Sequence, residues 1–136
     1  MLTLFVLAAA LSQPPTVDVA AVQTEIQGLY EDIRQMKQQS ETALDVDDLH
    51  DVLYTPDWTF VDKSGQSHSW TNVRQQQIAA LAHKPAESFY QPIRKLSVSS
   101  DGGTALVTIA ENGTTYKDTW VKSGESWKMK MRQQLD

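Results

Sequence analysis

Asp62 is an aspartate at the end of a predicted strand, and it follows two aromatic residues at alternate positions, Trp58 and Phe60. Alternate residues of a strand point to one face, so the two rings and the carboxylate are predicted to lie together. A carboxylate on an apolar face loses solvation when it ionises, which raises its pKa toward the range that acid–base catalysis requires. The alternative is a turn residue, because Ser64-Gly65 follows and an aspartate bonds the local backbone there.

The same pattern recurs near the C-terminus, where Asp118 alternates with Tyr116 and Trp120 on a second predicted strand. Two carboxylates in different surroundings are able to divide the acid and base roles of a proton transfer. The alternative for Asp118 is an ion pair or hydrogen bond buried under the sheet, because structural pairs also perturb pKa values. The sequence therefore offers Asp62 and Asp118 as catalytic candidates.

The aromatic residues of these segments are predicted to line a cavity for a small, mostly apolar molecule, although aromatics at this spacing also form ordinary core. Gln133 on the predicted inward face of the last strand is harder to explain as core, because a buried amide needs hydrogen-bonding partners. We expect it to contact a ligand or one of the aspartates. The candidate ligand-binding residues are Tyr54, Trp58, Phe60, Tyr116, Trp120 and Gln133.

Metal, cofactor and nucleic-acid sites are not predicted. His50, His68 and His83 show no short ligand spacing, so we expect no metal. The chain has no cysteine, which excludes disulfides and zinc–thiolate sites. A net charge of −5 without a basic cluster argues against binding of nucleic acid. The sequence has no Gly-rich phosphate loop, so we expect no nucleotide cofactor.

Residues 1–12 are typical of an export signal, because the apolar run Leu2–Ala10 is followed by small residues suited to cleavage after Ser12. The run is too short to cross a hydrocarbon core of about 30 Å. A buried N-terminal strand is the alternative, since the segment has no Lys or Arg. We therefore predict a periplasmic or secreted protein without stable membrane insertion after cleavage, with a linker at 13–17 and one domain at 18–136.

The spacing of apolar residues predicts helices first and strands afterwards, which is an α+β chain. Steps of three and four over Val19–Met36 predict a long amphipathic helix. A short helix is expected from Asp45 until Pro56 stops it, and a third over about 71–82 with Gln75–Gln77 mostly solvated. Strands are expected over 58–62, 88–91, 93–99, 104–111, 114–122 and 126–134, with a hairpin turn at Asn112-Gly113.

Strict alternation along the last strand predicts which of its side chains face inward. Trp127, Met129, Met131 and Gln133 would face the helices. The opposite face would carry a cationic outer stripe made of Lys117, Lys128, Lys130 and Arg132.

Two segments carry a family resemblance: Leu-Tyr-x-x-Asp-Trp-x-Phe-Val-Asp-x-x-Gly at 53–65 and Asp-x-Trp-x-x-x-Gly-x-x-Trp-Lys at 118–128. With the order of elements, they make the chain resemble the SnoaL-like branch of the nuclear transport factor 2-like superfamily, to which ketosteroid isomerases and small polyketide cyclases belong. The resemblance covers about residues 18–134. It implies a cone-shaped, curved, mostly antiparallel sheet wrapped around the long N-terminal helix, with two shorter helices and a pocket open at one end.

The resemblance also implies roles for single residues. Asp62 falls where ketosteroid isomerases keep their general base, and Asp118 where they keep a protonated acid that donates to the substrate oxygen. Their third group, a tyrosine of the first helix, has no expected counterpart. Ungapped counting back from Tyr54 reaches Gln38, and Tyr30 lies two turns too early.

Three functions remain open, because this superfold hosts all of them. The first is a domain that binds a small, mostly apolar molecule without chemistry. The second is an isomerase or cyclase that acts through Asp62 and Asp118. The third is an interaction module, such as a homodimer formed through the outer sheet face. The cationic outer stripe argues against an apolar sheet-to-sheet contact and leaves an acidic partner open.

Overall fold

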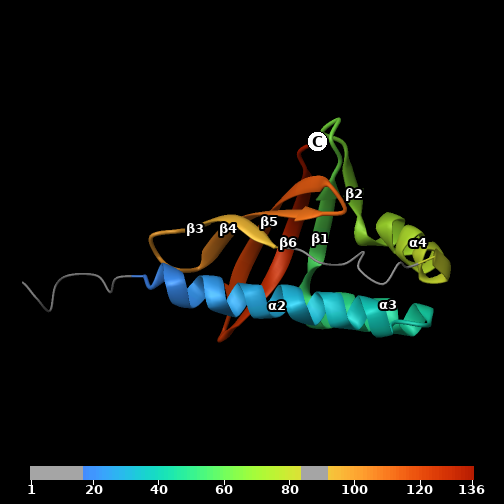
Figure 1. Cartoon of the computed structure of the whole chain (residues 1–136), viewed down its shortest axis with the longest axis horizontal. Coiled ribbons are helices and arrows are strands. Elements are labelled where there is room, and N and C mark those ends of the chain that lie inside the picture. Colours follow the sequence, from blue (N-terminus) through green and yellow to red (C-terminus); the bar gives the residue numbers. More distant parts are fainter. Residues whose placement is uncertain (1–16, 84–91) are drawn as a thin grey trace, which may run out of the picture.

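The computed structural model describes residues 17–83 and 92–136 and has the α+β architecture expected from the sequence (Figure 1). Within this part of the chain the elements are α2 (Val19–Gln39), α3 (Ala43–Leu53), β1 (Tyr54–Val61), β2 (Ser67–Ser69), α4 (Trp70–Ala80), the 3₁₀ turn η1 (Leu81–His83), β3 (Ile93–Val98), β4 (Thr104–Glu111), β5 (Thr114–Ser123) and β6 (Ser126–Gln134). The predicted signal segment 1–12 and the predicted strand 88–91 lie outside the described residues.

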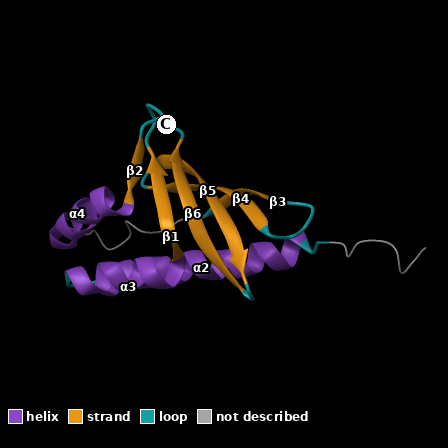
Figure 2. Cartoon of the chain, turned by 180° about the vertical axis from the view of Figure 1, so that it is seen from behind, coloured by secondary structure: helices purple, strands orange, loops and turns teal. Residues whose placement is uncertain are grey.

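The six strands form one curved, unclosed sheet in the order β2-β1-β6-β5-β4-β3. Neighbouring strands are antiparallel except β1 and β6, which are parallel. Figure 2 shows the strands crossing over α2, with α3 extending beyond the sheet and α4 standing at the β2 end. The apolar core therefore lies between the long helix and one face of the sheet, as predicted.

Helix α2 confirms the predicted amphipathic spacing. Its first turn is capped by Asp18, whose carboxylate accepts a hydrogen bond from the backbone N–H of Ala21 at 3.1 Å. Val19 is 45% exposed, so the first residue of the predicted apolar stripe lies outside the core. The buried residues of the helix are Val22, Ile26, Tyr30 and Ile33.

Helix α3 starts two residues earlier than predicted, because Thr42 and Asp45 form a capping box that fixes Ala43 as its first residue. The helix ends at Leu53, and β1 begins at once. Pro56 therefore lies inside β1 and does not end the helix. A register shift between β1 and β6 spans this proline, which has no N–H for the ladder.

Helix α4 spans nearly the same residues as the predicted third helix, but few of its side chains are buried. Val73 is its one buried residue. The helix nevertheless covers one side of a cavity described below, with Gln76 and Gln77 in the wall. Gln75 and Gln76 are exposed and Gln77 is half-buried, which agrees with the prediction that the glutamines of this segment are mostly solvated. Among the helices described, none combines the length and the apolarity needed to span a membrane.

The β4–β5 hairpin turns at Asn112-Gly113, as expected. Asn112 and Gly113 both have positive φ, at 51° and 81°, which is the backbone that a two-residue turn between twisted strands requires. The hairpin pairs Glu111 with Thr114 and continues in unbroken register to Thr104 and Val121. Glu111 is thereby fixed at the end of β4.

A bulge in β6 overturns the strict alternation predicted for this strand. Thr119 pairs with Met131 and Trp120 with Met129, so Lys130 is an extra residue on β6. Beyond this residue the faces exchange: Arg132 is 7% exposed and faces inward, whereas Gln133 is exposed. The predicted inward position of Gln133 and the outer position of Arg132 are both wrong. Without Arg132, the outer stripe keeps Lys117, Lys128 and Lys130.

Candidate functional site

A cavity of about 340 Å³ lies between helices α3 and α4 and the inner face of the sheet. One part of its wall is apolar and comes mainly from helices. These residues are Val46, Leu49, Trp58, Phe60, Trp70, Val73, Ala80 and Leu81. The other part is polar. It comprises Lys37, Ser40, Tyr54, Gln76, Gln77, Glu111, Asn112, Thr114, Tyr116 and Arg132. The cavity is thus two-sided: its wall has an apolar part and a polar part.

Aromatic rings in the wall are packed against one another and form a rigid surface. Tyr54 stacks on Trp58 with centroids 5.0 Å apart, and Trp70 meets Trp58 edge-on at 5.8 Å. Trp70 also stacks on His50 at 4.4 Å, which joins α3 to α4. The indole Nε1–H of Trp58 and the Nε2 atom of His50 have no hydrogen-bond partner among the described residues.

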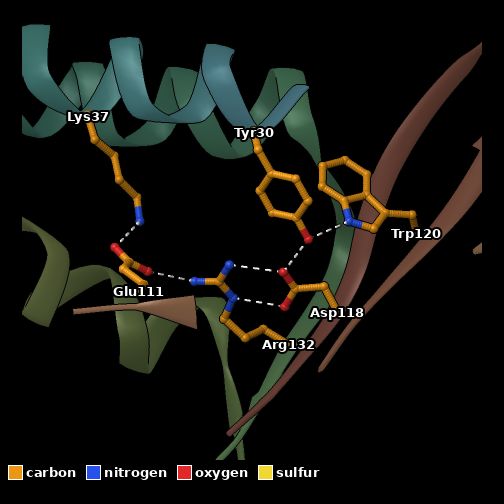
Figure 3. A network of polar contacts seen from close by, with 6 residues as sticks. All are labelled: Tyr30, Lys37, Glu111, Asp118, Trp120 and Arg132. Carbon is orange, nitrogen blue, oxygen red and sulfur yellow. Dashed lines mark hydrogen bonds and ion pairs between the residues drawn. The ribbon is translucent and has the colours of Figure 1, made fainter. Parts of the chain in front are cut away.

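A buried polar network begins behind the polar wall (Figure 3). Arg132 binds Asp118 through two parallel hydrogen bonds, from Nε to Oδ1 and from Nη2 to Oδ2, both at 2.9 Å. This bidentate pairing is the geometry of an ionised carboxylate facing a guanidinium. The phenol of Tyr30 donates to the same Oδ2 atom at 2.5 Å and accepts a hydrogen bond from Trp120 Nε1 at 3.0 Å. Asp118 and Trp120 have no exposed surface.

The network reaches the cavity through two further groups. Arg132 Nη1 donates to Glu111 Oε2 at 3.0 Å, and Glu111 Oε1 lies 3.8 Å from Lys37 Nζ. The side chains of Lys37 and Glu111 are each 12% exposed. Figure 3 shows the resulting path from Lys37 through Glu111, Arg132 and Asp118 to Tyr30, so that it leaves α2, passes through β4, β6 and β5 and returns to α2. The chain of contacts therefore connects the cavity wall to the core.

Burial and charge shift the pKa values of these groups in opposite directions. Loss of solvation lowers the pKa of Lys37, and the neighbouring carboxylate of Glu111 opposes that effect. Loss of solvation alone would lower the pKa of Arg132, but the charge and hydrogen bonds of Asp118 together with the charge of Glu111 raise it well above its ordinary value. Burial, with Asp118 beside it, raises the pKa of Tyr30 well above its ordinary value. Tyr30 is therefore a neutral donor at physiological pH.

The two tyrosines in the wall are also kept neutral. Burial raises the pKa of Tyr54 to about 12, although Arg132 opposes this. The pKa of the half-buried Tyr116 is raised for the same reason. Arg132 lies over the Tyr116 ring, 4.5 Å from its centroid, in a cation–π contact. Arg132 is thus held on three sides by Asp118, Glu111 and Tyr116.

Asp62 lies in the turn after β1, as the alternative interpretation expected. Its carboxylate accepts hydrogen bonds from the backbone N–H groups of Ser64 and Gln66 at 3.0 Å, from the Ser64 hydroxyl at 2.6 Å, and contacts His68 Nε2 at 2.8 Å. These contacts, with His68 the largest cause, lower the pKa of Asp62 far below its ordinary value. A raised pKa was expected for a general base, and Asp62 shows the opposite.

The candidate residues therefore separate into three groups. Tyr54, Trp58, Phe60 and Tyr116 line the cavity. Asp118 and Trp120 lie beneath the wall, where Asp118 forms the buried ion pair that was its alternative interpretation. Asp62 and Gln133 lie away from the cavity wall. The structure does not bring Asp62 and Asp118 into one site.

Sequence reasoning missed the four side chains that complete the network: Tyr30, Lys37, Glu111 and Arg132. Tyr30 was set aside as too early in the helix, yet it reaches Asp118. Its position four residues after the buried Ile26 was a usable signal, because residues four apart share a helix face. No sequence signal pointed to Arg132, since its inward position depends on the bulge.

A metal site does not emerge from this geometry. Within residues 17–83 and 92–136, no group of three His, Cys, Asp or Glu side chains is placed to hold a metal ion.

Comparisons with known proteins identify the fold. No protein-family model matches the chain, and no curated protein is similar in sequence. Crystal structures of several other proteins are similar to the backbone of this chain. An NTF-2-like protein of unknown function from Shewanella oneidensis MR-1 has a TM-score of 0.57 and 12% identity over 84% of this chain and 98% of its own. An NTF-2-like protein of unknown function from Silicibacter pomeroyi DSS-3 has a TM-score of 0.55 and 16% identity over 87% of this chain and 98% of its own.

A putative Ca/calmodulin-dependent kinase II association domain from Exiguobacterium sibiricum 255-15 is similar as well, with a TM-score of 0.53 and 15% identity over 90% of this chain and 95% of its own. At such identities the likeness concerns the backbone and not the activity. The three α-helices and the curved six-stranded sheet of residues 17–83 and 92–136, together with these neighbours, establish one conclusion: the chain has the nuclear transport factor 2-like fold.

Proposed function

We propose that this protein is an exported domain that binds one small, mostly apolar molecule in its cavity and does not transform it. The observation that carries the proposal is the two-sided cavity, in which packed aromatic rings face a fully paired polar network. A mostly apolar wall with a few fixed polar groups is the usual composition of small-molecule sites.

The size of the cavity limits the ligand. Its volume of about 340 Å³ lies near the lower end of ligand-binding sites, which run from about 300 to 1,000 Å³. The rigid rings Tyr54, Trp58 and Trp70 favour a flat molecule, since aromatic faces and edges pack best against planar partners. A compact ring system suits the space better than a long flexible chain.

The alternative of proton-transfer chemistry has less support. A carboxylate that acts as a general base must lie within reach of the substrate and have a pKa near the working pH. Asp62 is bound within its turn, and its pKa is lowered. Asp118 has no exposed surface and is occupied by Arg132 and Tyr30. Binding without chemistry requires neither group.

Export is part of the proposal and is supported by the apolar run and small residues of positions 1–12. Expression of the full chain in a bacterial host, followed by cell fractionation and mass spectrometry of the product, tests this part. A product found in the periplasm or medium and shortened at Ser12 or Ala10 is expected. An uncut product retained in the cytoplasm would contradict it.

Binding is best tested with a matched pair of cavity variants. Ala80 lines the cavity and the adjacent Ala79 does not, although both are exposed on α4. Ala80→Trp should fill the cavity, whereas Ala79→Trp adds the same bulk outside it. We expect 2-naphthol, an uncharged two-ring probe, to shift the indole N–H signals of Trp58 and Trp70 in ¹H–¹⁵N NMR spectra. The shifts should saturate in wild type and Ala79→Trp and vanish in Ala80→Trp. Equal behaviour of both variants would place binding elsewhere.

A further inference from the structure

The polar end of the cavity carries charges that cancel. Lys37, Glu111 and Arg132 line the wall, and Asp118 lies directly beneath Arg132. The two cations and two carboxylates are linked in one series of contacts, from Lys37 through Glu111 and Arg132 to Asp118. Each cation thus has a carboxylate partner within the protein, and the described network has no net charge.

A charged ligand group would disturb this balance. A carboxylate near Lys37 would also face Glu111, which already holds both cations. An ammonium group near Glu111 would face Lys37 and Arg132. Because the side chains are 9 to 12% exposed, water cannot compensate an added charge effectively. An uncharged hydroxyl or carbonyl avoids both conflicts and still forms hydrogen bonds with charged partners.

The charged groups of the wall are gathered in one place, whereas Gln76 and Gln77 of α4 add only uncharged polar groups. Glu111, Asn112 and Thr114 are neighbours on the β4–β5 hairpin, and they all line the cavity next to Arg132. Helices α3 and α4 supply the apolar part through Val46, Leu49 and Val73. A ligand that fits both parts has an apolar body and one polar end.

We infer that the ligand is an uncharged amphipathic ring compound, with a flat apolar body against the α3 and α4 side and a single hydroxyl or carbonyl at the Lys37–Glu111 end. This inference rests on the proposed function and adds the charge and polarity of the molecule. The charge balance of four named side chains decides it.

Three probes that share one ring system test the charge directly. 2-Naphthol is uncharged at neutral pH, 2-naphthoate is an anion, and 2-naphthylmethylammonium is a cation. Their dissociation constants are measured by NMR titration of the wild-type protein at one ionic strength. We expect 2-naphthol to bind at least about tenfold more tightly than either ion.

Two variants test whether the charge balance is the cause. Glu111→Gln leaves one excess positive charge, so the preference should move by about tenfold or more toward 2-naphthoate. Lys37→Met leaves one excess negative charge, and the preference should move toward 2-naphthylmethylammonium. Circular dichroism confirms that each variant is folded before titration. If neither variant folds, the ranking of the probes on the wild-type protein decides alone.

The outcomes separate this inference from the proposed function. If an ion binds wild type as tightly as 2-naphthol, the inference fails while the proposed function stands. If both variants fold and keep the wild-type ranking, charge balance is not the cause and the inference fails in the same way. If no probe shifts the signals of Trp58 or Trp70, the proposed function fails and the inference with it.

Discussion

Tyr30 on α2 donates a hydrogen bond to Asp118 on β5 across 2.5 Å, although the two residues are 88 positions apart in the chain. Both side chains are buried, with exposures of 1% and 0%. Tyr30 shares its helix face with Ile26 and Ile33, so the same rotation of α2 that buries these apolar residues also brings the phenol to the carboxylate. The contact therefore links the long helix to the centre of the sheet.

The hydrogen bonds of Asp118 link three elements of the fold. It accepts from Tyr30 of α2 and from Arg132 of β6, and it stands on β5. Its two oxygens are thus occupied within the protein. The carboxylate that the sequence offered as an acid is better understood as the centre of a structural network, which also positions Arg132 and Glu111 at the cavity.

Removal of Arg132 should strongly destabilise the fold. Arg132→Met leaves the carboxylate of Asp118 buried without its charge partner, which typically costs about 3–5 kcal/mol. Urea unfolding followed by tryptophan fluorescence measures the free energy of unfolding. Lys117→Met is the matched control, because Lys117 is exposed on the outer face and should show no large change. A loss below about 1 kcal/mol for Arg132→Met would contradict the buried pair.

The bulge in β6 should be dispensable once its extra residue is removed. Deletion of Lys130 joins Met129 directly to Met131, opposite the consecutive residues Trp120 and Thr119, so strict alternation then keeps Arg132 facing Asp118. We expect a loss of unfolding free energy well below that of Arg132→Met. Lys130→Ala keeps the length of the strand and removes only an exposed contact with Asp57 at 3.7 Å, so it should be nearly neutral. A deletion as destabilising as Arg132→Met would show that the inward position of Arg132 needs more than the register of β6.

Stability should fall in alkaline solution because of Tyr54. Its pKa is about 12 in the folded protein and about 10 when unfolded, so its contribution is complete below about pH 10 and is lost as pH rises toward 12. Above pH 10 the unfolded chain releases the proton first, which favours unfolding. The free energy of unfolding, measured from pH 9 to 11.5, should decline less steeply in Tyr54→Phe. Parallel curves for the variant and wild type would contradict the raised pKa.

Asp62 should show the opposite dependence on pH. Its folded pKa is lowered, so its stabilising contribution is present above the ordinary aspartate pKa of about 4 and is lost as pH falls further. The difference in unfolding free energy between wild type and Asp62→Asn should therefore shrink below about pH 4. Carboxyl-carbon NMR should find Asp62 ionised at pH 3. A carboxyl that titrates near 6 would restore Asp62 as a candidate base.

Local sequence patterns determined most of the backbone. Apolar steps of three and four placed α2, and Asn112-Gly113 placed the β4–β5 turn, because each depends on residues close together in the chain. The same kind of signal placed four of the aromatic residues at the cavity. The turn interpretation of Asp62 was also local, since its hydrogen-bond partners lie within six residues.

The tertiary structure decided the face of Arg132 and the partner of Tyr30. A single unpaired residue in β6 exchanges the two faces of the strand, and the residue letters on either side of Lys130 carry no mark of it. Tyr30 meets Asp118 only after the helix packs on the sheet. A buried charge must find its partner wherever packing brings one, so the polar network depends on contacts between distant elements, which alternation and spacing along the chain do not encode.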